Sequence, residues 1–142
     1  MKIIGIIFGA LAALLIFWMG FGFVWWQNNH EEVKTLVDQA LEEGKAIGLD
    51  STDQECLDAY LGIMKDCEDM TCTIQNQVFL KTCLEYSERT DTLCASAPAQ
   101  DDLIDLAAWA TDVCQGRDMT NPNCAAGLQE VALYCVRLMA EP

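Results

Sequence analysis

The first 27 residues are almost continuously apolar, whereas the rest of the chain alternates short amphipathic stretches with polar breaks. Residues 3–26 contain no charged side chain. A helix of this length spans roughly 36 Å at ~1.5 Å per residue, enough to cross a hydrocarbon core of ~30 Å. The run is longer than the apolar segment of a cleaved signal peptide, and it ends in bulky residues. We therefore expect an uncleaved transmembrane anchor over residues 1–27.

Small residues and aromatic residues mark two features of this expected anchor. Gly5, Gly9 and Ala13 recur at every fourth position, a spacing that lets a second helix approach closely. The general abundance of small residues in membrane helices explains the same spacing, so both interpretations stand. Trp25 and Trp26 are expected at the membrane–water interface, and the positive-inside rule favours a cytoplasmic N-terminus.

After the apolar segment, hydrophobic residues recur with helical spacing, and no segment alternates as a half-buried strand does. Residues 28–50 predict a membrane-proximal amphipathic helix or stalk, which begins at Asn28 or Asn29 and ends at Gly44 or Gly48. The pattern also allows this stalk to continue the anchor helix.

Residues 51–142 predict a disulfide-rich helical domain of two α-hairpins, at about 53–88 and about 101–140. Thr52 and Glu55 have the spacing of a capping box at the start of the first helix. The fold class is thus all-α: a single N-terminal transmembrane helix followed by about four helices. The expected core faces are Cys56, Leu57, Tyr60, Leu61, Met64 and Cys67; Ile74, Val78, Phe79, Cys83 and Tyr86; Leu103, Leu106, Ala107, Ala110, Val113 and Cys114; and Cys124, Leu128, Val131, Ala132, Cys135, Leu138 and Met139, with Asn123 capping the last helix.

The cysteine spacing is the most specific pattern in the chain. Within the expected helices, Cys56 and Cys67, Cys72 and Cys83, and Cys124 and Cys135 each lie eleven positions apart. This is a rotation of about 1100°, only ~20° from three full helical turns. The members of each pair therefore share a helix face. Folding each hairpin back on its turn brings together Cys56–Cys83, Cys67–Cys72, Cys94–Cys135 and Cys114–Cys124.

This arrangement resembles the twin Cys-x9-Cys helical hairpins of the mitochondrial intermembrane space. The resemblance covers residues 56–83 and, more loosely, residues 94–135. Ten residues separate the cysteines here instead of nine, and there are two hairpins. The resemblance implies a disulfide-stapled hairpin used as a scaffold or accessory subunit. It implies no catalytic residue, because the adjacent cysteine pair of the copper-carrying members is absent.

The charge balance is strongly acidic, with 22 Asp and Glu against 8 Lys and Arg and a net charge of −14. Nucleic-acid binding is excluded, because it needs a cationic surface that displaces counterions. Solubility and docking of a basic protein both explain the acidity. The candidate docking residues are Asp58, Asp66, Glu68, Asp69, Asp101, Asp102 and Asp105.

The sequence offers no pattern typical of catalysis or metal binding. It has one histidine, no Cys-x-x-Cys motif, and no catalytic triad or phosphate-binding loop. We therefore expect a protein that is not an enzyme, with no cofactor, no metal and structural disulfides. Disulfides persist in oxidising compartments. The expected location is the bacterial inner membrane with a periplasmic C-terminal domain, or secondly the mitochondrial inner membrane facing the intermembrane space.

Two functions follow as expectations. The leading one is a non-catalytic accessory or scaffold subunit of a larger membrane complex, which contacts integral membrane proteins and the lipid bilayer through the anchor. The alternative is a membrane-tethered acidic module that docks or neutralises a basic soluble protein, such as an electron carrier or a cationic hydrolase. Trp109 lies off its helix's apolar stripe and is expected either to pack between the hairpins or to anchor a partner.

Overall fold

A computed structural model of the chain describes residues 2–98 and 103–140, without the side chains at 2–13, 15, 23, 25–30, 91 and 103. The chain divides into two compact units, Met1–Leu36 and Val37–Pro142. Every element of the described residues is helical apart from one isolated bridge between Thr52 and Glu88, so the all-α prediction is confirmed. The helices are α1 (Lys2–Gly48), α2 (Asp53–Met64), α3 (Met70–Tyr86), α4 (Asp91–Ser96), α5 (Leu103–Gln115), the short 3-10 helix η1 (Cys124–Ala126) and α6 (Leu128–Ala140).

The expected transmembrane helix over residues 1–27 is wrong. No helix in the part of the chain that the structure describes is both long enough and apolar enough to cross a membrane. Within residues 1–27 the described side chains are those of residues 14, 16–22 and 24. The large apolar side chains described there are all exposed: Leu14, Ile16, Phe17, Trp18, Met19, Phe21 and Val24.

The expected stalk is part of the same helix. Helix α1 is continuous through Asn28 and Asn29, so neither residue caps a separate element, contrary to one prediction. Gly48 is the last residue of α1, as one of the two predicted ends requires, whereas Gly44 lies inside the helix.

The last three turns of α1 pack closely on α3. Small residues on α1 permit this close approach. Ala40 is fully buried. A Cβ atom built on Gly44 would lie 2.6 Å from the carbonyl oxygen of Phe79, and one on Gly48 would lie 2.6 Å from that of Cys83. Neither oxygen belongs to a flexible side chain, so only glycine fits at either position. Gly44 is therefore a packing residue inside the helix, and Gly48 is both a packing residue and the end of the helix.

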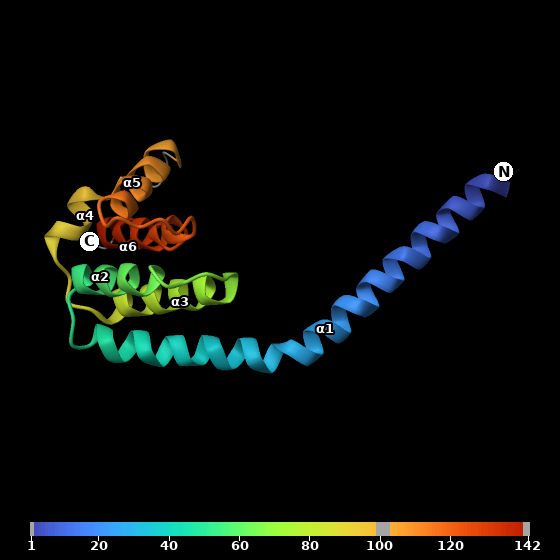
Figure 1. The fold of residues 1–142 in the computed structure, drawn as a ribbon, viewed down its shortest axis with the longest axis horizontal. Coiled ribbons are helices and arrows are strands. Elements are labelled where there is room, and N and C mark those ends of the chain that lie inside the picture. Colours follow the sequence, from blue (N-terminus) through green and yellow to red (C-terminus); the bar gives the residue numbers. More distant parts are fainter. Residues whose placement is uncertain (1, 99–102, 141–142) are drawn as a thin grey trace. The chain divides into compact units, whose positions relative to one another are not determined.

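Helices α2 and α3 form the first predicted hairpin and lie side by side (Figure 1). The capping box is present: Glu55 N donates to Thr52 Oγ1 (3.3 Å), and Thr52 N donates to Glu55 Oε2 (2.7 Å). The bond from Thr52 N, together with one from Thr52 Oγ1 to the same oxygen (3.0 Å), holds the pKa of the Glu55 carboxyl below its usual range. All the core residues predicted for α2, together with Cys67, are buried: Cys56, Leu57, Tyr60, Leu61, Met64 and Cys67.

Helix α3 departs from the predicted core face. It starts at Met70, because the Asp69 side chain accepts a hydrogen bond from Cys72 N (2.7 Å) and caps the helix. Ile74 and Tyr86 were predicted to be buried but are 47% and 44% exposed. Helix α3 contacts α1 on one side and α2 and α6 on others, so its buried surface is wider than a single stripe. Leu80 and Leu84 are buried in addition to Phe79 and Cys83.

We call the α2–α3 hairpin the first half of the domain and the helices from α4 to α6 its second half. The second half contains more separate helices than the predicted hairpin at 101–140. Cys94 lies in α4, a helix that the sequence pattern did not predict. Asn123 precedes the 3-10 helix η1 and makes no side-chain cap there, so it does not begin the last helix as predicted. Helix α6 starts at Leu128, and Met139 near its end is 72% exposed instead of buried. The remaining core residues of α6 are as expected: Leu128, Val131, Ala132 and Cys135.

The two halves share one core within residues 37–142. The buried Tyr60 hydroxyl of α2 donates to the Cys124 carbonyl (3.0 Å) and accepts from Gly127 N (3.0 Å). Gly127 permits this contact, because a Cβ there would lie 2.5 Å from the tyrosine ring. Asp53, which is fully buried, accepts hydrogen bonds from Thr90 N (3.0 Å) and Thr90 Oγ1 (2.5 Å).

Candidate functional site

Four disulfides staple the helical domain, and no cysteine in the structure is free. Cys67–Cys72 and Cys114–Cys124 close short loops at the hairpin tips. Cys56–Cys83 links α2 to α3, and Cys94–Cys135 links α4 to α6. No disulfide joins the α2–α3 hairpin to the helices that follow it. The pairs are those that the helical spacing predicts: Cys56–Cys83, Cys67–Cys72, Cys94–Cys135 and Cys114–Cys124.

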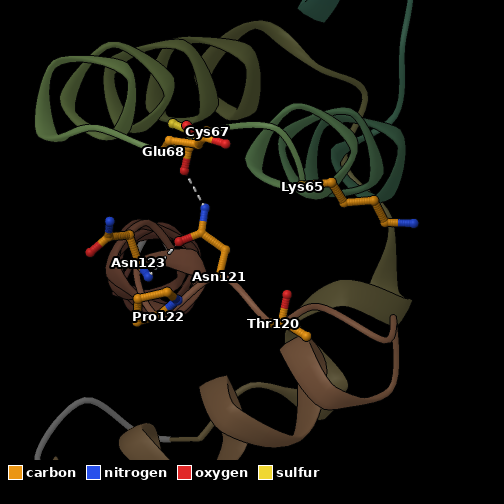
Figure 2. A pocket seen from close by; sticks show the side chains of 7 residues that line it. All are labelled: Lys65, Cys67, Glu68, Thr120, Asn121, Pro122 and Asn123. Carbon is orange, nitrogen blue, oxygen red and sulfur yellow. Dashed lines mark hydrogen bonds between the residues drawn. The ribbon is translucent and has the colours of Figure 1, made fainter.

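The turn between α2 and α3, residues 65–69, meets the segment 120–123 at a shallow hollow of about 330 Å³ (Figure 2). Asn121 connects the two segments. Its Nδ2 donates to the carbonyl oxygens of Met64 (2.7 Å) and Cys67 (2.5 Å), which are end groups of α2 and the turn. Its Oδ1 accepts from Asn123 N (2.8 Å). One amide thus satisfies carbonyls that a helix end leaves unpaired. The hollow is lined by Lys65, Cys67, Glu68, Thr120, Asn121, Pro122 and Asn123.

Three of the predicted docking residues lie together in this turn. Asp66, Glu68 and Asp69 are all exposed, and we call them the acidic turn. Asp69 has a structural task as well, because its carboxylate caps α3. Lys65 is the basic residue that borders them. The acidic turn therefore presents a compact net negative charge on a rigid, disulfide-closed support.

The other predicted docking residues do not join this group. Asp58 forms an ion pair with Arg117, which connects α2 to the end of the α5 region. Asp105 is exposed on α5, a different helix. Asp101 and Asp102 lie outside the described residues.

Several basic side chains of the domain contact acidic or aromatic side chains of the same domain. Arg117 pairs with Asp58, and Arg137 Nη1 lies 3.4 Å from Glu85 Oε1. The ammonium group of Lys45 lies 5.1 Å from the centre of the Tyr86 ring. These contacts are exposed, so each stabilises the fold only slightly. They also leave fewer cations to offset the acidic turn.

Trp109 is half-buried and packs against the core, in agreement with the packing alternative for this residue. It lines a hollow with Leu57 and Leu61 of α2, so it contributes to the contact between the halves. The backbone of the predicted helix-packing residues Gly5, Gly9 and Ala13, and of Trp25 and Trp26, lies in α1, but their side chains are outside the described part.

The polar residues that join the two halves were not predicted from the sequence. Tyr60 was predicted as core, but its hydrogen bonds to Cys124 and Gly127 involve positions more than sixty residues away. Burial raises the pKa of the Tyr60 phenol. Asp53 and Asn121 carried no signal, because an Asp after a cap and an Asn before a proline are ordinary choices at helix starts and turns.

The described residues contain no group of three or more His, Cys, Asp or Glu arranged to hold a metal ion. Comparison with known protein families, with curated proteins and with solved structures finds no match for the chain.

Proposed function

We propose that this protein is a non-catalytic binding module that docks a basic partner protein through the acidic turn. The observation that carries the proposal is the exposed charge of Asp66, Glu68 and Asp69 on a turn closed by the Cys67–Cys72 bond. A rigid surface loses little conformational entropy on binding, so such a surface suits an interaction role.

The overall charge supports the same function. The chain carries −14, and the arginines at Arg117 and Arg137 are already paired with acidic side chains of the domain. A surface of one sign raises the rate at which a partner of opposite sign is captured, and this effect weakens with salt. A cationic electron carrier or hydrolase has the chemistry of the expected partner.

The compartment is proposed from the disulfides. Four bonds of this kind persist where thiols are not kept reduced. The bacterial periplasm is our first choice, and the mitochondrial intermembrane space is the second.

The test begins with crosslinking of the full chain in its native cells, followed by mass spectrometry of the crosslinked peptides. We expect basic segments of one partner to crosslink to residues around the acidic turn. Binding of that purified partner is then measured at rising salt. The dissociation constant should rise by roughly tenfold or more between 50 and 200 mM salt.

Two double variants separate a local site from general acidity. Asp66→Asn with Glu68→Gln removes two charges from the acidic turn, and Glu42→Gln with Glu43→Gln removes two exposed charges from α1. We expect the first variant to weaken binding and the second to leave it nearly unchanged. Equal losses, or binding insensitive to salt, would refute the acidic turn as the docking surface.

A second candidate function rests on the exposed apolar residues of α1. The side chains at positions 14 and 16–19 point in different directions around the helix, because successive residues are rotated by about 100°. Leu14, Ile16, Phe17, Trp18 and Met19 are each more than half exposed. A helix that is apolar all round is normally covered. An accessory role in a larger protein assembly, with this segment packed among other subunits, accounts for that surface. Crosslinks from residues 14–24 to a fixed set of proteins would favour this role, and their absence would remove it.

A further inference from the structure

We propose that the Cys67–Cys72 disulfide is a thiol-responsive bond, which an uncharged dithiol reduces while the other three disulfides persist. The proposal does not rest on the docking function above. It rests on the access to this bond, the length of the loop that it closes, and the hydrogen-bond donors that face its sulfur atoms.

Access distinguishes Cys67–Cys72 from the disulfide that lies deepest in the same hairpin. Cys72 is only half-buried, whereas Cys56 and Cys83 are both completely buried. Thiol–disulfide exchange requires a thiolate to reach one of the two sulfur atoms. A reductant can therefore approach Cys72 without unfolding of the core.

Loop length distinguishes it from the disulfides of the second half, where Cys94 is also half-buried. Cys67–Cys72 spans five positions in the sequence, against 41 for Cys94–Cys135 and 10 for Cys114–Cys124. A short loop restricts the unfolded chain least, so this bond contributes least to the stability of the fold. Its reduction consequently costs the folded protein least.

Two side chains of α3 face the sulfur atoms that reduction would turn into thiolates. Asn76 Nδ2 lies 3.3 Å from Cys72 Sγ and 3.8 Å from Cys67 Sγ. Thr73 Oγ1 also lies 3.9 Å from Cys67 Sγ, but its proton is donated to Asp69 O (3.0 Å). The Asn76 amide is therefore the donor that stabilises a negative sulfur here. The Asp69 carboxylate, bonded to Cys72 N, opposes the same charge and makes an uncharged reductant the better fit.

The reaction is an exchange that balances. One thiolate of the dithiol attacks Cys72 Sγ, the S–S bond breaks, and Cys67 leaves as a thiolate that takes up a proton. The second thiol of the reductant then attacks the reductant's own sulfur in the mixed disulfide and releases Cys72. The dithiol is oxidised to a cyclic disulfide by two electrons, and the two cysteines receive both electrons and both protons.

The structural consequence is confined to one end of the hairpin. Cys67 also accepts a hydrogen bond from Asn121 through its carbonyl oxygen, so the bond supports the turn at the hollow of Figure 2. The core disulfide Cys56–Cys83 still holds α2 and α3 together. Reduction therefore loosens residues 65–72 and leaves the helical domain folded.

The experiment treats the folded full chain with dithiothreitol at increasing concentrations, blocks the free thiols with iodoacetamide, and locates the label by peptide mass spectrometry. We expect Cys67 and Cys72 to be labelled at about one tenth of the dithiothreitol needed for any other pair, while the helical circular dichroism is retained. Earlier labelling of another pair would overturn the proposal, and so would labelling of all eight cysteines together.

Variants test the role assigned to the facing side chains. Asn76→Leu removes the amide donor at similar volume and should slow reduction about tenfold, the effect of one hydrogen bond to a charged group. Asp69→Asn keeps a capping side chain without its charge and should accelerate reduction. Gln129→Leu, an exposed amide on α6, is the control and should have no effect. Equal rates in the Asn76→Leu variant and the control would show that Asn76 does not act on this bond.

Discussion

At the scale of single residues, the Tyr60 hydroxyl is the polar group on which the contact between the two halves depends most directly. It is buried, it donates to Cys124 O, and it accepts from Gly127 N. Removal of a hydroxyl in such a place leaves a donor and an acceptor without partners inside the protein. The penalty for each is larger than the net gain from an ordinary hydrogen bond.

We predict that Tyr60→Phe lowers the free energy of unfolding by about 1–3 kcal/mol, measured by urea denaturation of the oxidised full chain. Tyr86→Phe is the matched control, because Tyr86 is exposed and contributes its ring to the contact with Lys45. The control should stay within about 0.5 kcal/mol of the parent. A similar loss in both variants would contradict the role given to the buried hydroxyl.

The same residue predicts a loss of stability in alkali. Burial raises the pKa of the Tyr60 phenol, and burial together with the charge of Asp53 raises that of Tyr134. The folded state thus holds these protons more tightly than the unfolded chain does. Their contribution is complete below the unfolded pKa of about 10 and is lost as pH rises through the folded pKa.

Urea denaturation at a series of pH values from 8 to 12 measures this dependence. We expect a constant contribution up to pH about 10 and a fall above it. The fall should be shallower in Tyr60→Phe, which has one fewer buried phenol. An unchanged slope in that variant would assign the alkaline loss to other groups.

At the scale of helices, close packing of α1 on α3 depends on two glycines that the sequence pattern predicts as helix ends. A Cβ atom added at Gly44 or Gly48 would lie 2.6 Å from a carbonyl oxygen of α3. Gly62 in α2 has no neighbouring atom within 4 Å of such a Cβ. The three positions therefore offer the same substitution in two different environments.

We predict that Gly44→Ala and Gly48→Ala each lower the free energy of unfolding by about 1–3 kcal/mol, because the helices must separate or distort. Gly62→Ala should instead raise it by about 0.5–1 kcal/mol through helix propensity. Urea denaturation of the three variants compares them, and hydrogen exchange locates the change. Stabilisation by alanine at Gly44 would refute the close approach of α1 and α3.

The helices also show what sequence can and cannot give. The capping box at Thr52 and the apolar face of α2 were predictable, because both depend on neighbours within one helix. The exposure of Ile74 and the start of α6 at Leu128 could not be predicted, because they depend on which other helices cover each face. At the acidic turn the charges were visible in sequence, whereas the Asn121 bonds that hold the turn involve residues more than fifty positions away.

At the scale of the whole molecule, the four disulfides differ in how much of the unfolded chain they restrict. Cys94–Cys135 spans 41 positions and Cys67–Cys72 spans five. Loop-closure entropy assigns the longer loop about 2 kcal/mol more stabilisation than the shorter one. The bonds are therefore unequal, although all four lie in one domain.

We predict that replacing Cys94 and Cys135 by alanine lowers the free energy of unfolding by about 2 kcal/mol more than replacing Cys67 and Cys72. Urea denaturation of the two double variants, each with its remaining disulfides intact, makes the comparison. Equal losses would show that native packing around the sulfur atoms, instead of loop entropy, sets the stability of these bonds.

The nesting of the disulfides has a consequence for how the molecule is made. Cys56–Cys83 encloses Cys67–Cys72, Cys94–Cys135 encloses Cys114–Cys124, and no bond joins one set to the other. Every sulfur of the first hairpin therefore has its final partner once residue 83 has emerged during synthesis. The first half can complete its oxidation before the four cysteines of the second half emerge, which leaves three possible pairings of its own four cysteines.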